Sequence, residues 1–473
     1  MSESLPGIPF GTDGWRAIIA DGFTFETVRL VSRAIAIAAR EVDAPDHVDR
    51  SRLVVGFDRR FLSREFAEEV AVELKEAGYC VLLSSGPTPS QTVSHAVVSR
   101  GVIGGIVVTA SHNPAVYNGI KFKGWYGGSA LPSTYAQIAS YLGFDQRREG
   151  GSIERVELMH PYVEALREQL DVARLSSAGL RILHDPIHGA AAGIPERVLD
   201  AGSTTVTTVR GEINPSFGGV NPEPIPDNLE VSMQTMRAGT FDLAICNDGD
   251  ADRLGILDET GSFVSPHKVI SLLALYLVRQ KGRKGEIIKT FSTTRLIERI
   301  GRALGIAVHE TPIGFKYVAD LMLAREILIG GEESGGIGFG SFLPERDGVL
   351  SGLLVAEAVA AAGKPLSVLI REMEEEFGFS EYDRLDVTAP IEEAERLIRR
   401  VLEGDLDEVF EVSLDRRESV DGAKLSFNDD SWILFRKSGT EPLIRIYCEA
   451  ADRARVDRML EIAVRELRAP AGT

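Results

Sequence analysis

The stretch LVVGFDRRFLSREFAEEVAVELKEAGYCVLL, residues 53–83, decides the fold class of this chain. It opens with an apolar run, Leu53–Phe57, continues through an amphipathic stretch, Phe66–Ala77, and closes with a second apolar run, Cys80–Leu83. Short apolar runs rich in β-branched residues predict buried strands, and the amphipathic stretch predicts a helix. Strands that alternate with helices are typical of a parallel sheet covered by helices.

The same alternation continues through the first three quarters of the chain. Further strands are predicted at Gly105–Val108, Arg181–Leu183, Leu243–Cys246, Glu286–Lys289 and Ile327–Ile329. A helix is predicted over Pro161–Leu170, because proline is favoured at the first helical position. In sheets of this kind ligands bind beyond the carboxyl ends of the strands. The unusual polar segments of this chain stand at such strand ends, so we expect several of them to share one site.

The last hundred residues have a different pattern, that of a small α+β domain. Its predicted elements are a strand at Tyr382–Thr388, a helix at Ile391–Leu402, a hairpin of Ala423–Phe427 with Trp432–Phe435, a strand at Leu443–Cys448 and a helix at Arg453–Leu467. We place the boundary before it between Glu374 and Glu381. Earlier boundaries are expected near Gly150-Gly151 and near Leu257.

The composition of the chain excludes several classes of protein. The 473 residues carry 52 Lys and Arg against 70 Asp and Glu, a net charge of −18, which argues against nucleic-acid or anionic-membrane partners. The apolar run Val349–Ala362 is too short to span a bilayer and contains Glu357, so a buried helix is expected there. The N-terminus has no secretory pattern, and we expect a cytoplasmic protein.

The cysteines point to the same compartment. Cys80, Cys246 and Cys448 are far apart in sequence, so they form no disulfide framework, and their spacing matches no zinc site. We therefore expect a reducing environment.

The first chemical segment is Gly105-Ile-Val-Val-Thr-Ala-Ser-His-Asn-Pro114, in which a buried strand ends in polar residues. It presents Ser111 on a turn, with His112 beside it. A serine in this position is a nucleophile if a base or a metal assists it; the alternative is a turn capped by hydroxyls. Lys121 follows, either as a surface lysine or as a group that holds a phosphate or carries a proton.

The second segment, Asn247-Asp-Gly-Asp-Ala-Asp-Arg253, places three aspartates at alternate positions after a strand. Carboxylates this close repel one another unless a cation or protons compensate, and an all-oxygen set favours Mg²⁺ or Ca²⁺. An EF-hand fits poorly, because Arg253 stands where that loop requires glycine. The remaining alternative is an acidic turn on a solvated surface.

Three other segments add candidate binding residues. Gly330–Gly336 offers Glu332 and Ser334, whose oxygens suit sugar hydroxyls. Arg436-Lys-Ser-Gly-Thr-Glu-Pro442, followed by Arg445, concentrates donors for an anion. Phe10–Arg16 is a glycine-rich stretch that ends in an arginine. The chain contains neither a Walker A sequence nor a G-x-G-x-x-G fingerprint after a strand, so nucleotide binding has no support.

Taken together, these segments resemble the α-D-phosphohexomutase superfamily. The resemblance covers nearly the whole chain, with the motifs in the family's order: Thr109–Pro114, Asp248–Arg253, Gly331–Gly335 and Arg436–Thr440. It implies three related α/β mixed-sheet domains and a C-terminal α+β phosphate-binding domain around a central cleft. The expected domains are 1–152 with the phosphoserine loop, 153–257 with the metal loop, 258–377 with the sugar loop and 378–473 with the phosphate clamp.

The resemblance also implies roles for individual residues. It implies that Ser111 is phosphorylated, that Mg²⁺ is held by the phosphoserine together with Asp248, Asp250 and Asp252, and that Glu332 and Ser334 bind the sugar. The expected phosphate clamp consists of Arg436, Ser438, Gly439, Thr440 and Arg445. Arg16, Lys121, Arg253 and His112 are expected at the reacting centre, with Lys121 the preferred general acid or base. Gly314 and Lys316 are expected to bind substrate.

The sugar loop favours glucose as the substrate. Glu332-Glu-Ser334 and Gly314-Phe-Lys316 resemble the loops of glucose-selective members, so we expect a phosphoglucomutase that uses glucose 1,6-bisphosphate as intermediate and activator. Gly336 and Phe315 stand where other members have histidine, which removes a histidine proton relay. The alternatives are a phosphomannomutase, a phosphoglucosamine mutase, a phosphopentomutase, a hexose 1,6-bisphosphate synthase or a non-catalytic phosphosugar sensor. The sequence leaves the oligomeric state open.

Overall fold

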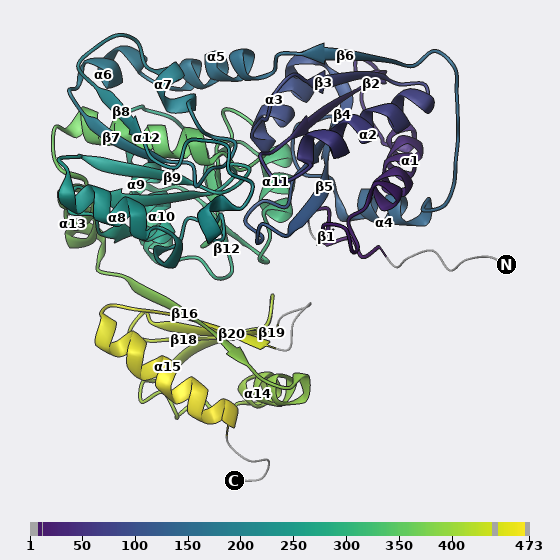
Figure 1. The fold of residues 1–473 in the computed structure, drawn as a ribbon. Coiled ribbons are helices and arrows are strands. Elements are labelled where there is room, and N and C mark those ends of the chain that lie inside the picture. Colours follow the sequence, from purple (N-terminus) through teal and green to yellow (C-terminus); the bar gives the residue numbers. More distant parts are fainter. Residues whose placement is uncertain (1–7, 12, 438–442, 469–473) are drawn as a thin grey trace. The chain divides into compact units, whose positions relative to one another are not determined.

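The computed structural model describes residues 8–11, 13–437 and 443–468. By its internal contacts the chain divides into two compact units. The first comprises Met1–Gly285 and Gly314–Leu369, and the second comprises Glu286–Ile313 and Ile370–Thr473. Figure 1 shows both units and labels many of their helices and strands.

The first unit begins with a mixed sheet of six strands in the order β1-β5-β4-β2-β3-β6. These strands are β1 (Trp15–Ile18), β2 (Asp49–Phe57), β3 (Cys80–Ser84), β4 (Val102–Val108), β5 (Tyr117–Gly124) and β6 (Ser152–Val156). Strands β4, β2, β3 and β6 are parallel to one another. Strand β5 is antiparallel to β4, and β1 is antiparallel to β5. The associated helices are α1 (Phe25–Glu41), α2 (Ser63–Glu76), α3 (Ser90–Arg100) and α4 (Pro132–Ser140).

Both faces of this sheet are covered, which explains the continuous apolar run in β2. Leu53 and Val55 pack into a core with residues of α1 and α2. Val54, between them, packs into a second core with Val93 and Val97 of α3. Successive side chains of a strand point to opposite faces, so a strand between two layers of helices is apolar at every position.

A second mixed sheet follows, with the order β11-β10-β9-β7-β8. Its strands are β7 (Arg181–Asp185), β8 (Thr205–Thr208), β9 (Leu243–Asn247), β10 (Leu254–Asp258) and β11 (Phe263–Val264). The helices of this region are α5 (Met159–Gln169), α6 (Val172–Ser177), α7 (Ile194–Val198), α8 (Glu230–Ala238) and α9 (Pro266–Arg279), with short 3₁₀ turns at Phe217–Gly219 and Pro226–Asn228.

The first unit also contains α11 (Phe315–Ala324), the antiparallel pair β14 (Ile327–Gly331) and β15 (Ile337–Gly338), and α12 (Gly348–Ala362). The predicted buried helix at Val349–Ala362 is confirmed as α12, and Asp347 caps it by accepting from the backbone N–H of Leu350 at 2.8 Å. Among the described residues no single helix is long and apolar enough to cross a membrane; α12 and α13 (Leu366–Phe377) meet that criterion only as a bent pair.

The second unit contains an antiparallel sheet in the order β16-β20-β19-β18-β17. Its strands are β16 (Glu381–Thr388), β17 (Leu414–Glu418), β18 (Ala423–Phe427), β19 (Trp432–Lys437) and β20 (Leu443–Ala450), and it packs with α14 (Ile391–Glu403) and α15 (Arg453–Arg468) around a shared core. The parallel pair β12 (Glu286–Thr290) and β13 (Val308–Thr311), with α10 (Leu296–Leu304), also belongs to this unit.

The predicted strands and helices are all present, with ends that differ by a few residues. The start at Pro161 is wrong: α5 begins at Met159, because the Glu157 carboxylate accepts from the backbone N–H groups of Met159 and His160 at 2.8 and 2.7 Å. Several strands were not predicted, and β5 is the most consequential of them.

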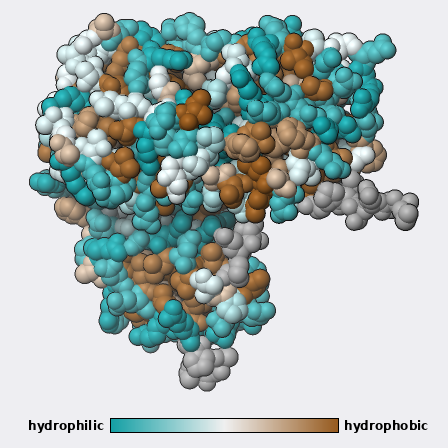
Figure 2. Space-filling view, viewed as in Figure 1, coloured by the Kyte–Doolittle hydropathy of each residue, from teal (hydrophilic) through white to brown (hydrophobic). Residues whose placement is uncertain are grey.

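On the face shown in Figure 2, hydrophilic residues lie between the hydrophobic ones.

Candidate active site

Ser111 lies on a strained turn directly after β4. Its φ is +53°, a left-handed conformation that a residue other than glycine rarely adopts. The Thr109 hydroxyl accepts from the Ser111 backbone N–H at 2.9 Å, and the Ser111 side chain is buried. The Ser111 hydroxyl donates to Oδ2 of Asp248 at 2.9 Å. The turn therefore aims one hydroxyl at the predicted metal loop.

The three aspartates of that loop converge. Asp248, Asp250 and Asp252 are fully buried, and each offers one carboxylate oxygen within 4.8 Å of the others. The interpretation as a solvated acidic turn is therefore wrong. Burial, together with Asp252 and Asp250, holds the pKa of Asp248 well above its ordinary value. Oδ1 of Asp250 and Oδ1 of Asp252 have no hydrogen-bond partner among the described residues. Hard, buried, unpartnered oxygens of this kind suit a divalent cation.

The serine turn and the metal loop touch each other. A Cβ on Gly249 would lie 2.6 Å from the backbone oxygen of Ser111, so only glycine permits this approach. The first turn of α3 supports the same loop. The backbone N–H of Ser90 donates to the carbonyl of Asp250 at 3.0 Å, and the Gln91 side chain donates to the carbonyl of Ala251 at 2.9 Å. Elements from both mixed sheets thus assemble one site.

Lys121 enters this site from β5. Its ammonium lies 3.1 Å from Asp13, 2.8 Å from Asp250 and 3.0 Å from Asp252. Burial alone would lower the pKa of Lys121, but these carboxylates hold that pKa well above its ordinary value. Lys121 is therefore an ammonium at neutral pH, which suits charge neutralisation and proton donation better than proton abstraction.

The other predicted residues of the reacting centre lie around Ser111. The Nδ1 atom of His112 is 3.4 Å from the Ser111 hydroxyl. Burial, Arg253 and Arg16 hold the pKa of His112 well below its ordinary value, so the ring is neutral. The backbone N–H of Arg253 donates to Asp248 at 3.0 Å, and its guanidinium pairs with Glu223 at 2.8 Å. Arg16 donates to the side chain of Asn113.

The predicted sugar loop reaches the same centre. Glu332 is buried, and burial raises the pKa of Glu332 to about 7, with Arg346 opposing the rise. Gly335 accepts from the backbone N–H of Leu254 at 3.0 Å, two residues beyond the last aspartate of the metal loop. Ser334 is half-buried in the turn between them.

Arg346 is a functional candidate that the sequence analysis missed. Its guanidinium lies 2.9 Å from Asp13, 2.8 Å from Asp252 and 3.5 Å from Glu332. A Cβ on Gly336 would meet Cδ of Arg346 at 2.3 Å. The arginine thus fills the space beside Gly336, where other members of the resembled superfamily have histidine. A charged triplet, Glu345–Asp347, directly before an apolar helix was the available signal.

Gly314 and Lys316 lie on either side of Phe315, which packs against Arg346. Gly314 has a φ of +130° at the N-terminus of α11. Phe315 is buried, and the Arg346 guanidinium lies 5.6 Å from the centre of its ring. Lys316 places its ammonium 4.8 Å from the ring centre of Tyr317.

Arg60 is a second residue that was missed. It is buried, and it forms an ion pair with Asp58 at 3.1 Å. Its guanidinium donates to three backbone carbonyls of the serine turn, Ser111 at 2.5 Å, Asn113 at 2.6 Å and Pro114 at 2.9 Å, and to that of Tyr117, the first residue of β5, at 3.1 Å. Arg60 therefore holds the turn in its left-handed conformation without touching the Ser111 hydroxyl. Its position in Asp58-Arg-Arg60, after a strand, was the only sequence signal.

The predicted phosphate clamp lies in the second unit. Arg436 on β19 and Arg445 on β20 are direct cross-strand partners, so two like charges face each other. Asp421 accepts from Arg436 at 3.0 Å, and Asp386 lies 3.6 Å from Arg445. The other predicted members, Ser438, Gly439 and Thr440, lie outside the described residues. The described part of the clamp is rich in donors, as an anion site requires.

Comparisons with known proteins identify the family of the chain. The family model for phosphoglucomutase/phosphomannomutase matches in four parts: α/β/α domain I at residues 7–148, domain II at 160–261, domain III at 265–377 and the C-terminal domain at 393–466. These parts cover most of the chain and agree with the predicted four-domain α/β architecture.

Individual relatives differ in the sugar they are named for. A Thermococcus kodakarensis phosphoglucomutase/phosphomannomutase is 30% identical over 97% of this chain and 98% of its own. A Methanothermobacter thermautotrophicus protein, provisionally named a phosphoglucosamine mutase, is 32% identical over 95% of each chain. A Thermus thermophilus structure, provisionally named a phosphomannomutase, has a TM-score of 0.86 and 37% identity over 98% of this chain and 99% of that one. The chain therefore belongs to the phosphoglucomutase/phosphomannomutase family, whose members are phosphosugar mutases.

Proposed function

We propose that this protein is a phosphoglucomutase that interconverts glucose 1-phosphate and glucose 6-phosphate through a phosphoserine at position 111. The observation that carries the proposal is the strained turn that aims the Ser111 hydroxyl, 2.9 Å away, at Asp248 in a buried aspartate cluster. Phosphoryl transfer depends on positioning and charge neutralisation more than on covalent chemistry. A fixed serine beside a cation site and several cationic side chains supports that reaction.

The aspartate cluster, together with the Ser111 oxygen, would hold Mg²⁺. The fit rests on three converging carboxylates, two of which keep an oxygen without a partner in the part of the chain that the structure describes. When bound, the ion supplies positive charge to phosphoryl oxygens. Arg253, Arg16 and Lys121 place further positive charge around the Ser111 hydroxyl.

The proposed cycle needs a proton acceptor and a site that accepts either end of the sugar. The P–O bond to Ser111 breaks while a new P–O bond forms to the free hydroxyl of the substrate. The proton of that hydroxyl passes to a base, for which the neutral His112 is the candidate, 3.4 Å from Ser111, and the Ser111 oxygen that leaves the phosphorus takes up a proton in turn. The resulting glucose 1,6-bisphosphate reorients in the site so that its other phosphate faces Ser111. The phosphoryl group of that phosphate is then transferred to Ser111. Arg436 and Arg445 would hold the phosphate that does not react.

The preference for glucose rests on Glu332-Glu-Ser334 and on Phe315-Lys316, which resemble glucose-selective loops. Steady-state kcat/KM for the 1-phosphates of glucose, mannose, glucosamine and ribose tests it, with glucose expected to give the highest value. A higher kcat/KM for another sugar identifies that mutase instead. Net accumulation of bisphosphate from an external phosphoryl donor would indicate a synthase, and phosphosugar binding without turnover would indicate a sensor.

The protonation of Glu332 predicts a pH-dependent KM. Burial raises the pKa of this carboxyl to about 7, so below that pH it loses the charge with which it accepts hydrogen bonds from sugar hydroxyls. We expect KM for glucose 1-phosphate to rise as pH falls through about 7. In Glu332→Gln, KM should be higher and independent of pH between about 6 and 8. The exposed Glu326→Gln is the control and should keep the wild-type profile.

Glu332 should also make the stability of the protein depend on pH, with a sign opposite to that of a carboxylate whose pKa is lowered by folding. Because its pKa is higher in the folded state, the folded protein binds the extra proton between about pH 4.5 and 7. Its contribution to the free energy of unfolding therefore falls as pH rises through that range. A difference in unfolding free energy between wild type and Glu332→Gln that is the same at about pH 5 and pH 8 would contradict this.

The contacts of Arg60 predict that its substitution changes kcat much more than KM. Arg60→Lys keeps the charge beside Asp58 but cannot reach four carbonyls, so the serine turn relaxes while the sugar site stays intact. We expect kcat to fall by about tenfold to a hundredfold with KM changed less than about threefold. The exposed Arg155→Lys is the matched control. Arg60→Met should instead cost roughly 3–5 kcal/mol of stability, because it leaves buried Asp58 unpaired.

A further inference from the structure

A second polar cavity lies in the first unit, away from the hydroxyl of Ser111. Its volume is about 260 Å³, and its walls come from the loops after β2 and β3, the start of α5, and α7. The polar side chains of the wall are Arg59, Ser84, Ser85, Thr88, Glu157 and Arg197. A cavity of this size accommodates a small phosphorylated molecule rather than a single water.

The two arginines of this cavity have no carboxylate partner among the described residues. Arg59 is half-buried and donates to the carbonyl of Gly211 at 2.7 Å, while its Nε is buried without a partner. Burial lowers the pKa of Arg59, and Glu212 opposes this only from a distance. Arg197 is exposed on α7 and forms no ion pair within the described ranges. Two guanidinium groups left unpaired are unexpected in a protein of charge −18.

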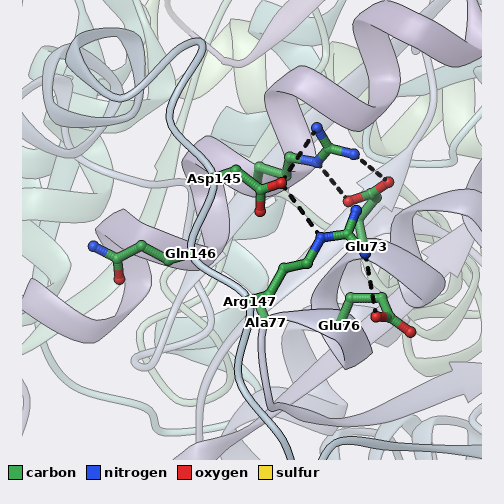
Figure 3. Close-up of a pocket in the computed structure, with 7 residues that line it drawn as sticks. Glu73, Glu76, Ala77, Asp145, Gln146 and Arg147 are labelled. Carbon is green, nitrogen blue, oxygen red and sulfur yellow. Dashed lines mark hydrogen bonds and ion pairs between the residues drawn. The ribbon is translucent and has the colours of Figure 1, made fainter.

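Another pocket of the first unit shows arginines that are paired with carboxylates. In the pocket of Figure 3, Arg33 pairs with Glu73 at 2.7 Å, and Arg147 pairs with Asp145 at 3.4 Å and with Glu76 at 3.5 Å. These ion pairs leave a volume of only about 10 Å³, room for no more than about one water. The arginines there are paired with carboxylates, whereas Arg59 and Arg197 line an open cavity with no such partner among the described residues.

The remaining polar groups of the cavity suit an oxyanion. Ser84 donates to the carbonyl of Gly86 at 2.7 Å, and the buried Thr88 hydroxyl has no partner among the described residues. Ser85 is exposed at the mouth. Glu157 adds one negative charge, but its two oxygens accept from the N-terminus of α5. Guanidinium and hydroxyl donors together are typical of phosphate recognition.

The walls of the cavity continue directly into the active site. Arg59 precedes Arg60, which holds the serine turn. Thr88 lies two residues before Ser90, which donates to the carbonyl of Asp250 at 3.0 Å. The backbone N–H of Ala190, another wall residue, donates to the carbonyl of Gly249 at 3.0 Å. A ligand in the cavity therefore contacts Ala190, which hydrogen-bonds to the metal loop, and residues close in the chain to Arg60 and Ser90, which hydrogen-bond to the two catalytic loops.

We propose that this cavity is a second, regulatory site for a phosphate group, carried by a small phosphomonoester or by free phosphate, and that its occupancy changes turnover through the two loops. Binding is independent of the proposed mutase reaction, while the effect on turnover rests on it. Arg59 and Arg197 bind the phosphate oxygens, and the exposed Ser85 hydroxyl donates a hydrogen bond. Because ligand contacts fix Arg59, they restrict the adjacent Arg60 and the turn that it holds.

Equilibrium binding tests the site without requiring activity. Inorganic phosphate and glycerol 3-phosphate are titrated into Ser111→Ala protein and into the same protein carrying Arg59→Gln and Arg197→Gln, and dissociation constants are measured by calorimetry. We expect a second binding event that the double substitution weakens by at least about tenfold. An added Arg52→Gln, which changes an exposed arginine elsewhere, should leave it unchanged. The probe that binds more tightly identifies the source of the phosphate.

Turnover provides the second test. With Ser111 intact, the stronger probe should change kcat in wild type and in Arg52→Gln, but not in the Arg59→Gln, Arg197→Gln protein. Thermal melting must show that this protein folds; if it does not, Arg197→Gln alone serves, since that side chain is exposed. Equal phosphate affinity with and without the two arginines would overturn the proposal. Loss of binding with no change in kcat would overturn the regulatory part, and inactivity of the unsubstituted protein would overturn the proposed function alone.

Discussion

Ser111→Ala is expected to lower mutase turnover by at least about a thousandfold, roughly 4 kcal/mol of activation free energy. The hydroxyl at this position is the proposed acceptor and donor of the phosphoryl group, and Asp248 lies 2.9 Å from it. The Ser90 hydroxyl also reaches the aspartate cluster, but it donates to Asp250, at 2.5 Å, and stands at the start of α3 rather than on the left-handed turn. A coupled assay of glucose 1-phosphate, with and without added glucose 1,6-bisphosphate, measures the loss.

The phosphoryl adduct itself provides the decisive measurement. Mass spectrometry of wild-type protein during turnover should find one phosphoryl group on the peptide that contains Ser111, and none on Ser111→Ala. Ser140→Ala, which removes an exposed hydroxyl at the end of α4, should keep both adduct and activity. Full turnover by Ser111→Ala, or an adduct on another residue of the working enzyme, would disprove the proposed role of Ser111.

Asp250→Asn is expected to remove the dependence on Mg²⁺ together with most of the activity. The substitution keeps the shape of the side chain but removes one of three carboxylates that converge within 4.8 Å. Activity at saturating Mg²⁺ should fall by at least about a hundredfold, roughly 3 kcal/mol. A metal titration followed by activity measures the first effect, and thermal melting with and without the metal measures the second.

The melting experiment separates loss of metal from loss of fold. At about one hundred times its Kd, Mg²⁺ should stabilise the wild-type protein by roughly 2.7 kcal/mol, and Asp250→Asn should show little of this gain. Asp21→Asn, which changes an exposed aspartate, should respond like wild type. An Asp250→Asn protein that gains the full stabilisation from Mg²⁺ would place the metal elsewhere.

Predictions from sequence succeeded where apolar side chains fill both faces of a strand. In β2, Leu53, Val54 and Val55 are all buried between two layers, and such a run is visible in the sequence alone. The metal loop was also predictable, since alternate aspartates after a strand must converge. Its burial was not, because burial depends on the serine turn, which comes from the other sheet.

Strand β5 shows why the remainder could not be predicted. Lys121 and Lys123 are buried on it, and lysines interrupt the apolar pattern by which a strand is recognised. Their partners are remote in sequence: Lys121 pairs with aspartates of the metal loop, and Lys123 pairs with Glu345 at 2.5 Å. Arg60 and Arg346 were missed for the same reason, because each is explained by a group far along the chain. The buried lysines that serve the site therefore interrupt the apolar pattern by which β5 would be recognised in the sequence.

The close approach of Arg346 to Gly336 limits how the active site of this protein can change by mutation. Any side chain at position 336 collides with the arginine as it now lies, so a histidine introduced there alone would displace it from Asp252, Asp13 and Glu332. Removing Arg346 first would instead leave those carboxylates without their counter-charge. A change from glycine at position 336 with Arg346 to histidine at that position without Arg346 would therefore pass through single substitutions of low activity. A protein that has the glycine and arginine pair would tend to retain it.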